Sequence, residues 1–241
     1  MDNSLYYLAV NRQLGLSAEL DMIANNLANM DTTGFRREGL AFTEFVVSAQ
    51  VGESVSMADL GARFVSEIAG AFSMTGGRLD MAIEGEGYFA IDTADGIRLT
   101  RAGAFQTSPE GFLVTPSGDE VLDIGQAPIP IPVEAKDVLV ASDGTVSSNG
   151  DLIAQIGVFD APRELISRFG DTAFIVEDDA FEAVVDAQVR QGALEQSNVD
   201  AVTEIARMIE VTRAYETAQS LIADEDERIR EAIQKLGQVA A

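Results

Sequence analysis

The chain has 241 residues with no cysteine, histidine or tryptophan, and its 40 acidic against 16 basic residues give a formal net charge of −24. The absence of cysteine excludes disulfides, thiol catalysis and zinc–thiolate sites, and the absence of histidine removes the usual base of a serine triad. So acidic a chain is unsuited to binding nucleic acid, where lysine and arginine must neutralise phosphate, and anionic membrane surfaces repel it.

No stretch approaches the ~18 consecutive apolar residues of a membrane-spanning helix, so we expect no direct membrane insertion. The N-terminus, MDNSLYYLAVNRQLG, carries an acid where a secretory signal needs basic residues, and no small-residue cleavage pattern follows. The sequence alone therefore predicts a cytoplasmic protein, or one exported without cleavage of a signal.

A first helix is predicted from residue 3 to about residue 31. Leu16, Leu20, Ile23 and Leu27 recur at steps of four, three and four, so they lie on one face of the helix. Their stripe is narrow, as in a coiled coil, and it is flanked by asparagines. Gly34 is predicted to stop the helix, because glycine accepts the left-handed conformation that follows a C-cap.

The middle of the chain predicts β structure. Residues 36–77 show no sustained period and are predicted to form an extended, partly strand-like connector. From about residue 79 the apolar period becomes two, with turn signals between short runs. Asp95-Gly96 is a candidate two-residue hairpin loop. We therefore expect an all-β domain, arranged as a sandwich or an open barrel.

A second helix of about 38 residues is predicted up to the C-terminus. We expect Ser197 or Asn198 to cap it, with Asp200 in its first turn. Its apolar positions recur at steps of three and four, and neighbouring positions widen the stripe. The stripe residues are Ile205, Met208, Tyr215, Ile222, Ile229, Ile233 and Leu236. The residues that widen it are Val202, Ile209 and Leu221. A helix of ~55 Å suggests a coiled coil.

These elements predict an α+β fold, in which the N- and C-terminal helices pair as a coiled-coil layer and an all-β domain is inserted between them. Spacing alone leaves two interpretations of the helical stripes open. They pack within one chain as an ordinary hairpin, or they pack between chains. The length of the helices, the narrow stripe and the asparagine-rich flank favour assembly.

The sequence offers no convincing catalytic, cofactor or metal site. Glu84 and Glu86 lie in an EGEG turn between two strands and are expected to be exposed turn residues rather than an acid/base couple. Asp143-Gly144 and Asn149-Gly150 lack the spacing of an EF-hand, and no P-loop or G-x-S-x-G motif occurs. We predict that the protein is not an enzyme.

Five segments resemble the rod and hook proteins of the bacterial flagellar axial structure. IANNLANMDTTGF (residues 23–35) resembles their N-terminal motif, and GALEQSNVDAVTEIARMIEVTRAYETAQSLI (192–222) their C-terminal motif. TGGRLDMAIEGEGYFAI (75–91), LTRAGAF (99–105) and GFLVTPSGDEVL (111–122) are similar to their β domain. Within this family the chain is most similar to the proximal rod proteins. The alternatives are a distal rod or hook-type member, or a non-flagellar soluble binding module.

The resemblance implies a structural subunit that stacks helically into a rod and transmits torque from motor to hook. It implies an inner coiled-coil domain made of residues 1–35 and 191–241, a connector at 36–77 and an outer β domain at 78–190. Its partners would be other rod proteins, copies of itself and the flagellar type III export apparatus, and its location the basal-body rod crossing the periplasm.

The stripes and the terminal motifs together predict an assembly interface. Its expected residues are Leu16, Leu20, Ile23, Asn25, Asn26, Leu27, Asn29, Thr33, Gly34, Phe35, Asn198, Val199, Ile205, Met208, Ile209, Tyr215, Ile222, Ile229 and Ile233. The asparagines are expected either to fix the register by hydrogen bonds, as buried polar residues do in coiled coils, or simply to be solvated.

Overall fold

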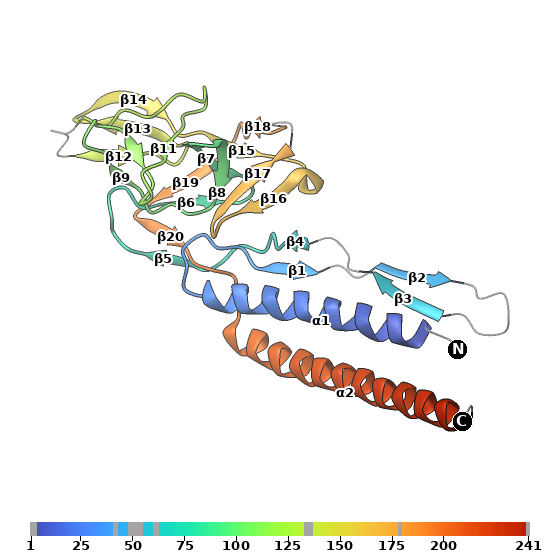
Figure 1. Ribbon diagram of the computed structural model, residues 1–241. Helices are drawn as coiled ribbons and strands as arrows, with labels where there is room; N and C mark the ends of the chain where they lie inside the picture. The colour runs from blue at the N-terminus through green and yellow to red at the C-terminus, as the bar shows by residue number, and fades with distance from the viewer. Residues whose placement is uncertain are drawn as a thin grey trace. The chain divides into compact units, whose positions relative to one another are not determined.

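The chain divides into two compact units, each assembled from segments that are distant in the sequence. The computed structural model describes residues 4–40, 43–47, 55–59, 63–132, 137–177 and 180–239. The first unit comprises Met1–Ala28, Glu38–Phe64 and Asp200–Ala241, and the second comprises Asn29–Arg37 and Val65–Val199. Both helices belong to the first unit, and most of the strands belong to the second (Figure 1).

The first unit is built on the two terminal helices. The elements in it are α1 (Ser4–Ala28), α2 (Ala201–Val239), β1 (Glu38–Leu40), β2 (Thr43–Val47), β3 (Val55–Asp59) and most of β4 (Arg63–Val65). The helices are in contact and flank a central β-rich region of the chain, so the predicted α+β fold class is confirmed. No helix in the described part of the chain combines the length and hydrophobicity needed to cross a membrane.

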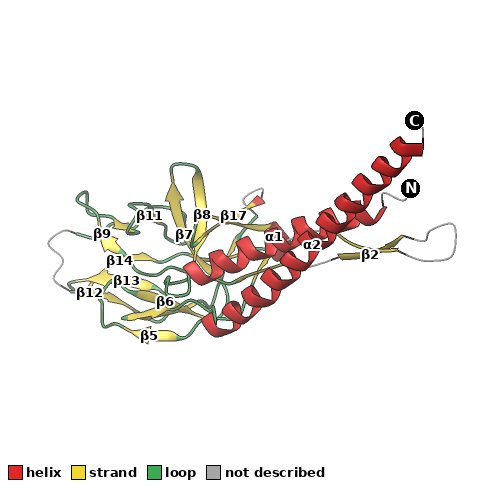
Figure 2. Ribbon diagram, turned by 60° about the horizontal axis from the view of Figure 1, so that its bottom comes forward, coloured by secondary structure: helices red, strands yellow, loops and turns green. Residues whose placement is uncertain are grey.

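The two helices run antiparallel and pack through a small apolar cluster (Figure 2). Met22 and Ile23 of α1 are fully buried against Val211 of α2. Around them lie four partly buried residues: Leu16, Leu20, Leu40 and Met208. Part of the predicted stripe of α1 therefore faces α2 within one chain.

Both helices are bounded differently from the prediction. α1 ends at Ala28, so Gly34 lies six residues beyond it and is not its C-cap. α2 begins at Ala201, and Asp200 rather than Ser197 or Asn198 is its N-cap, because an Asp200 side-chain oxygen accepts the backbone N–H of Thr203 at 2.7 Å. This hydrogen bond holds the pKa of the Asp200 carboxyl below its ordinary value.

The second unit holds the β domain. Its strands are β5 (Phe72–Met74), β6 (Met81–Glu84), β7 (Tyr88–Thr93), β8 (Gly96–Thr100), β9 (Gln106–Thr107), β10 (Leu113–Val114), β11 (Glu120–Val121), β12 (Val138–Val140), β13 (Thr145–Ser148), β14 (Asp151–Gln155), β15 (Val158–Asp160), β16 (Ile166–Phe169), β17 (Ala173–Val176), β18 (Glu182–Ala183), β19 (Gln188–Gln191) and β20 (Ala193–Glu195). A 3₁₀ turn, Arg163–Leu165, precedes β16.

The largest sheet runs in the order β16-β17-β8-β7-β11-β10-β9, with β15 also paired to β7 and to β18. Smaller sheets pair β12-β13-β14, β19-β6 and β20-β5. The predicted hairpin at Asp95-Gly96 joins β7 to β8, but its loop is one residue earlier, since Thr93 and Gly96 are already paired. The positive φ of 102° at Gly96 is accommodated at the first position of β8.

Two apolar clusters form the core of the second unit, and Phe89 lies in the larger one. This side chain is fully buried in β7 and packs edge-to-face on Phe105, with 5.2 Å between the ring centroids. Ile91 of β7 lies in the same cluster, and Ala90 between them lies in the smaller one, so this strand is buried on both faces.

We expect Phe89→Ala to lower the free energy of unfolding by ~3–5 kcal/mol, because it removes a buried ring and leaves a cavity. Urea unfolding followed by circular dichroism measures the change. Leu152→Ala is the control: Leu152 is 75% exposed, and its truncation should change stability by less than ~0.5 kcal/mol. Equal effects of the two substitutions would contradict the assigned core.

Candidate assembly site

Three of the sequence motifs meet at one buried carboxylate in the second unit. Glu195, from the C-terminal motif, forms ion pairs with Arg36, which follows the N-terminal motif, and with Arg101 of LTRAGAF. The distances are 2.6 Å from Arg36 Nη2 to Oε1 and 3.2 Å from Arg101 Nη1 to Oε2. All three side chains are almost completely buried. Segments separated by about 60 to 160 positions are thus tied to one side chain.

The remaining hydrogen bonds of this cluster go mainly to the backbone. Arg36 donates to the carbonyl of Glu67 at 2.6 Å, and Arg101 to the carbonyl of Gly85 at 2.7 Å. Glu195 Oε1 also accepts the backbone N–H of Gly70 at 3.1 Å. The carboxylate therefore also fixes a segment that the sequence presented only as a connector.

Two guanidinium groups share one carboxylate, so the cluster carries one more positive than negative charge. Burial lowers the pKa of Arg101, and Glu195 partly opposes this shift. Buried ion pairs contribute little net stability, because desolvation offsets their attraction, but removal of one partner leaves an unpaired buried charge. The cluster therefore specifies how these segments meet.

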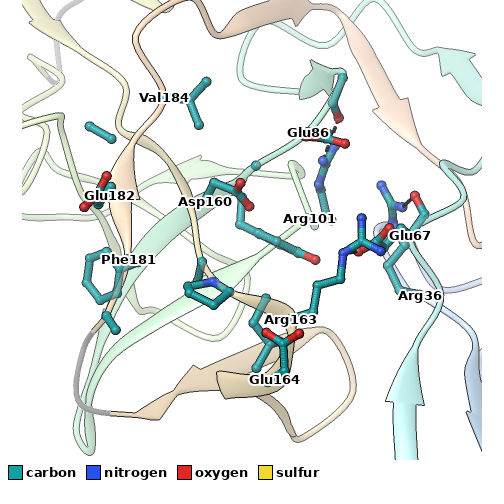
Figure 3. A pocket seen from close by; sticks show the side chains of 18 residues that line it. Arg36, Glu67, Glu86, Arg101, Asp160, Arg163, Glu164, Phe181, Glu182 and Val184 are labelled. Carbon is teal, nitrogen blue, oxygen red and sulfur yellow. Dashed lines mark hydrogen bonds and ion pairs between the residues drawn. The ribbon is translucent and has the colours of Figure 1, made fainter.

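Both arginines line an open cavity of about 960 Å³. Figure 3 shows Arg36, Arg101, Arg163 and Glu67 on one side of this cavity and Phe181 with Glu182 on the other. Tyr88 also lines it, and burial raises the pKa of its hydroxyl, with Arg101 opposing the shift. The cavity walls hold mixed charges contributed by strands and loops of the second unit only.

Glu84 and Glu86, the two carboxylates considered for catalysis, have different surroundings. Glu84 is ion-paired with the half-exposed Arg190, whereas Glu86 lines the cavity. β6 ends at Glu84, and Gly85, with a φ of 100°, separates it from Glu86 in the turn that follows.

Gly34 packs so closely on the β domain that only glycine fits. A Cβ at this position would lie 2.3 Å from the backbone nitrogen of Ala102, and its φ is 72°. Its N–H donates to the Glu195 carbonyl at 2.8 Å. Gly34 is therefore the point where the backbone of the N-terminal motif contacts both the LTRAGAF segment and the C-terminal motif.

The residues that follow Gly34 also make specific contacts. Phe35 is fully buried beneath the Arg168 guanidinium, whose carbon lies 4.4 Å from the ring centroid. Asn198 accepts the backbone N–H of Arg37 at 2.6 Å and donates to the carbonyl of Ile68 at 2.7 Å. Asn198 thus ties the two terminal motifs together instead of capping α2.

Asn26 is the asparagine that bridges elements in the first unit. It is fully buried, donates to the Glu38 carbonyl at 3.0 Å and to Glu204 at 3.4 Å, and accepts the Glu38 N–H at 2.9 Å. It therefore links α1 to β1 and α2. Asn29 is also buried, in the second unit, and accepts the Thr32 hydroxyl, whereas Asn25 is exposed.

The face that α2 turns to α1 differs from the predicted one. Glu204, Val211 and Ala218 are buried at heptad spacing, with Met208, Tyr215 and Ile222 partly buried beside them. Apolar periodicity missed this line because Glu204 is polar and is paired with Asn26, and because Ala218 is small. Ile205 and Ile209, expected in the stripe, are instead 46% and 49% exposed.

The structure thus separates the predicted interface residues into three groups. In the first unit, Leu16, Leu20, Ile23, Asn26 and Met208 lie at the contact between α1 and α2, and Leu27, Tyr215 and Ile222 are partly buried. In the second unit lie Asn29, Thr33, Gly34, Phe35, Asn198 and Val199. Exposed on the helices are Asn25, Ile205, Ile209 and Ile229, and the side chain of Ile233 lies outside the described residues.

Three family models match the chain in succession. The model described as "Flagella basal body rod protein" matches residues 7–36, "Flagellar hook protein FlgE/F/G D1 domain" matches 82–148, and "Flagellar basal body rod FlgEFG protein C-terminal" matches 190–235. Arg36 and Arg101 lie in the first two matches and Glu195 lies in the third. The buried cluster therefore joins all three matched regions.

Whole proteins match nearly end to end. The flagellar basal-body rod protein FlgF of Caulobacter vibrioides is 40% identical, covering 99% of this chain and 100% of its own length. FlgF of Rhizobium meliloti is 37% identical over 96% and 97% of the two chains. The rod protein FlgG of Bacillus subtilis is 31% identical over 94% and 97%.

We expect Glu195→Gln to lower the free energy of unfolding by ~3–5 kcal/mol, since it leaves two buried guanidinium groups without their counter-charge. Urea unfolding followed by circular dichroism measures this loss. Glu84→Gln is the matched control, because it breaks a partly exposed ion pair with Arg190 that contributes at most ~1 kcal/mol. Indistinguishable unfolding midpoints for the two variants would contradict the role assigned to Glu195.

Proposed function

Because the chain belongs to the flagellar basal-body rod protein family, we propose that it is the FlgF-type subunit of the proximal rod. The family is structural, not enzymatic. Within one organism, Caulobacter vibrioides, the FlgF relative is 40% identical to this chain and the FlgG relative 29%. This difference supports a proximal over a distal position in the rod.

The observation that carries the proposal is the unequal length of the paired helices. α1 has 25 residues and α2 has 39. Contacts of Asn26 with Glu204 and of Glu19 with Arg207 place the C-terminal part of α1 beside the N-terminal part of α2. At ~1.5 Å per residue α2 is longer by ~20 Å, so its last turns have no α1 residues opposite them.

Those last turns contain the predicted stripe residues Ile229, Ile233 and Leu236. Ile229 is 38% exposed. A second apolar face near the start of α2 carries Ile205 and Ile209, which α1 does not cover. Burial of each such side chain by a neighbouring subunit would contribute ~1.5–3 kcal/mol. These surfaces support packing of the terminal helices between subunits.

Contacts of this kind are heterologous, because one patch meets a different patch on the next subunit and the chain of subunits stays open. We propose that copies of this chain and of neighbouring rod proteins stack helically in this way. The residues predicted for the interface are proposed to act there: the exposed ones on the helices make the contacts, the buried ones of the first unit shape the helix pair, and those of the second unit hold the segments that meet near Glu195.

We further propose that residues 1–35 and 191–241 form the inner coiled-coil layer of the rod, with 36–77 as a connector and 78–190 as the outer β domain. Torque would pass from the helices to the β domain through the segments that meet at Glu195. The rod crosses the periplasm, and the chain would reach it through the flagellar type III export apparatus with its N-terminal region as an uncleaved signal.

We expect Ile205→Asp combined with Ile209→Asp to abolish incorporation into basal bodies and swimming motility. The stability of the isolated protein should change by less than ~0.5 kcal/mol per site, because both side chains are exposed in the single chain. Replacing the rod subunit of a flagellated cell with the variant, then immunoblotting purified basal bodies and assaying motility in soft agar, measures the effect.

Thr203→Asp is the control, because this exposed residue lies two positions before Ile205 and is therefore rotated by about 160° from it around the helix. It should assemble normally. Full incorporation of the double variant would refute the proposed contact face of α2.

A further inference from the structure

β5 (Phe72–Met74) has an open edge. Among the described strands it pairs only with β20, in the register Phe72 with Glu195 and Met74 with Ala193. The Thr75 N–H bonds to the Gly192 carbonyl, and the Gln196 N–H to the Ala71 carbonyl. In an antiparallel ladder, alternate residues bond to the partner strand. The backbone N–H and C=O groups of Phe72 and Met74 therefore point away from β20.

The side chains along this edge are apolar and exposed. Ile68 is 76% exposed, Phe72 37% and Met74 69%. An open, apolar edge strand is a template for pairing with another chain, and folded proteins usually protect such edges with charges, prolines or bulges. Here the edge carries none of these on β5 itself, which has the sequence FSM.

The charge around this edge is unlike that of the rest of the chain. Residues 68–79 contain no aspartate or glutamate, although the protein has 40 acidic residues. The charged groups nearby include Arg78 in this segment and Asp80, which accepts the Thr75 hydroxyl. Arg190 is ion-paired with Glu84, and its guanidinium lies 5.7 Å from the Phe72 ring centroid. Two copies with a charge of −24 each repel over most of their surfaces, but an acidic neighbour can approach here.

The first unit supplies a strand of complementary character. β2 (Thr43–Val47) pairs only with β3 among the described strands, and β3 lies beside α1. An isolated pair of strands is marginally stable in water. β2 has the sequence TEFVV, which combines an acid with three consecutive apolar residues. Its sequence therefore suits an apolar edge strand whose own segment, residues 68–79, contains Arg78 and no acidic residue.

We propose that β2 of a second copy of this chain adds to the open edge of β5. This proposal rests on the proposed rod function and names a contact between neighbouring subunits that the helices do not make. The contact joins two different elements, so it is heterologous and can repeat along a rod. Pairing of β5 with β5 of another copy would instead close a symmetric dimer and stop growth.

Cysteine cross-linking tests this contact cleanly, because the natural chain has no cysteine. Two copies are expressed together in cells that lack their own rod subunit. One is epitope-tagged and carries Met74→Cys, and the other carries a single cysteine at position 45, 46 or 47. With one cysteine per chain, no disulfide can form within a chain. Basal bodies are purified, oxidised and analysed on non-reducing gels.

We expect a mixed disulfide that is strong at one position of β2 and weak at its neighbours. Successive side chains of a strand point to opposite faces, and a disulfide needs Cα atoms within ~4.4–6.8 Å. Disulfides formed only between two Met74→Cys copies, or mixed disulfides of equal yield at all three positions, would overturn the proposal. So would the absence of any cross-link in basal bodies that contain both copies.

Absence of both copies from the basal bodies would instead refute the rod function. A charge variant provides an independent readout. Met74→Glu should reduce incorporation at least tenfold, because it adds repulsion at the edge. Leu152→Glu, at an exposed position of β14, should not. Equal incorporation of both would also overturn the strand contact.

Discussion

One buried carboxylate holds together the parts of the chain that carry the family signatures. Glu195 binds Arg36, Arg101 and the backbone of Gly70, and its own carbonyl accepts the N–H of Gly34. Because a charge inside a protein is tolerated only when it is paired, these contacts depend on one another. The geometry of the second unit where the terminal segments enter it follows from this requirement.

A buried polar side chain also fixes the arrangement of segments in the first unit. Asn26 bonds to both backbone groups of Glu38 and to the side chain of Glu204. A shift of α2 along α1 by one turn would break the bond between the buried Asn26 and Glu204 side chains, whereas both bonds to Glu38 would remain, and the loss of a buried hydrogen bond lowers stability. Apolar packing of Met22 and Ile23 brings the helices together, and Asn26 determines the register.

Local patterns predicted the elements but not the contacts that fix them. The terminal helices and the β-rich middle follow from apolar periods of about 3.6 and two. The Glu195 cluster could not be predicted, because it joins positions 36, 101 and 195, and no local pattern encodes contacts between distant positions. Its only sequence signal is one arginine inside a motif, Arg101, and one directly after a motif, Arg36, in a chain that is poor in basic residues. The helix contact was partly missed because Glu204 is buried through pairing and not through hydrophobicity.

The difference in length between α1 and α2 gives the helix pair a direction. Two antiparallel helices of equal length would cover each other along their whole length. Here α2, with 39 residues, extends past the N-terminal end of α1, which has 25, so only one end of the helix pair carries an uncovered helix surface. In the proposed stack, each added subunit would cover the extension of the one before it and present its own, so the stack would be polar.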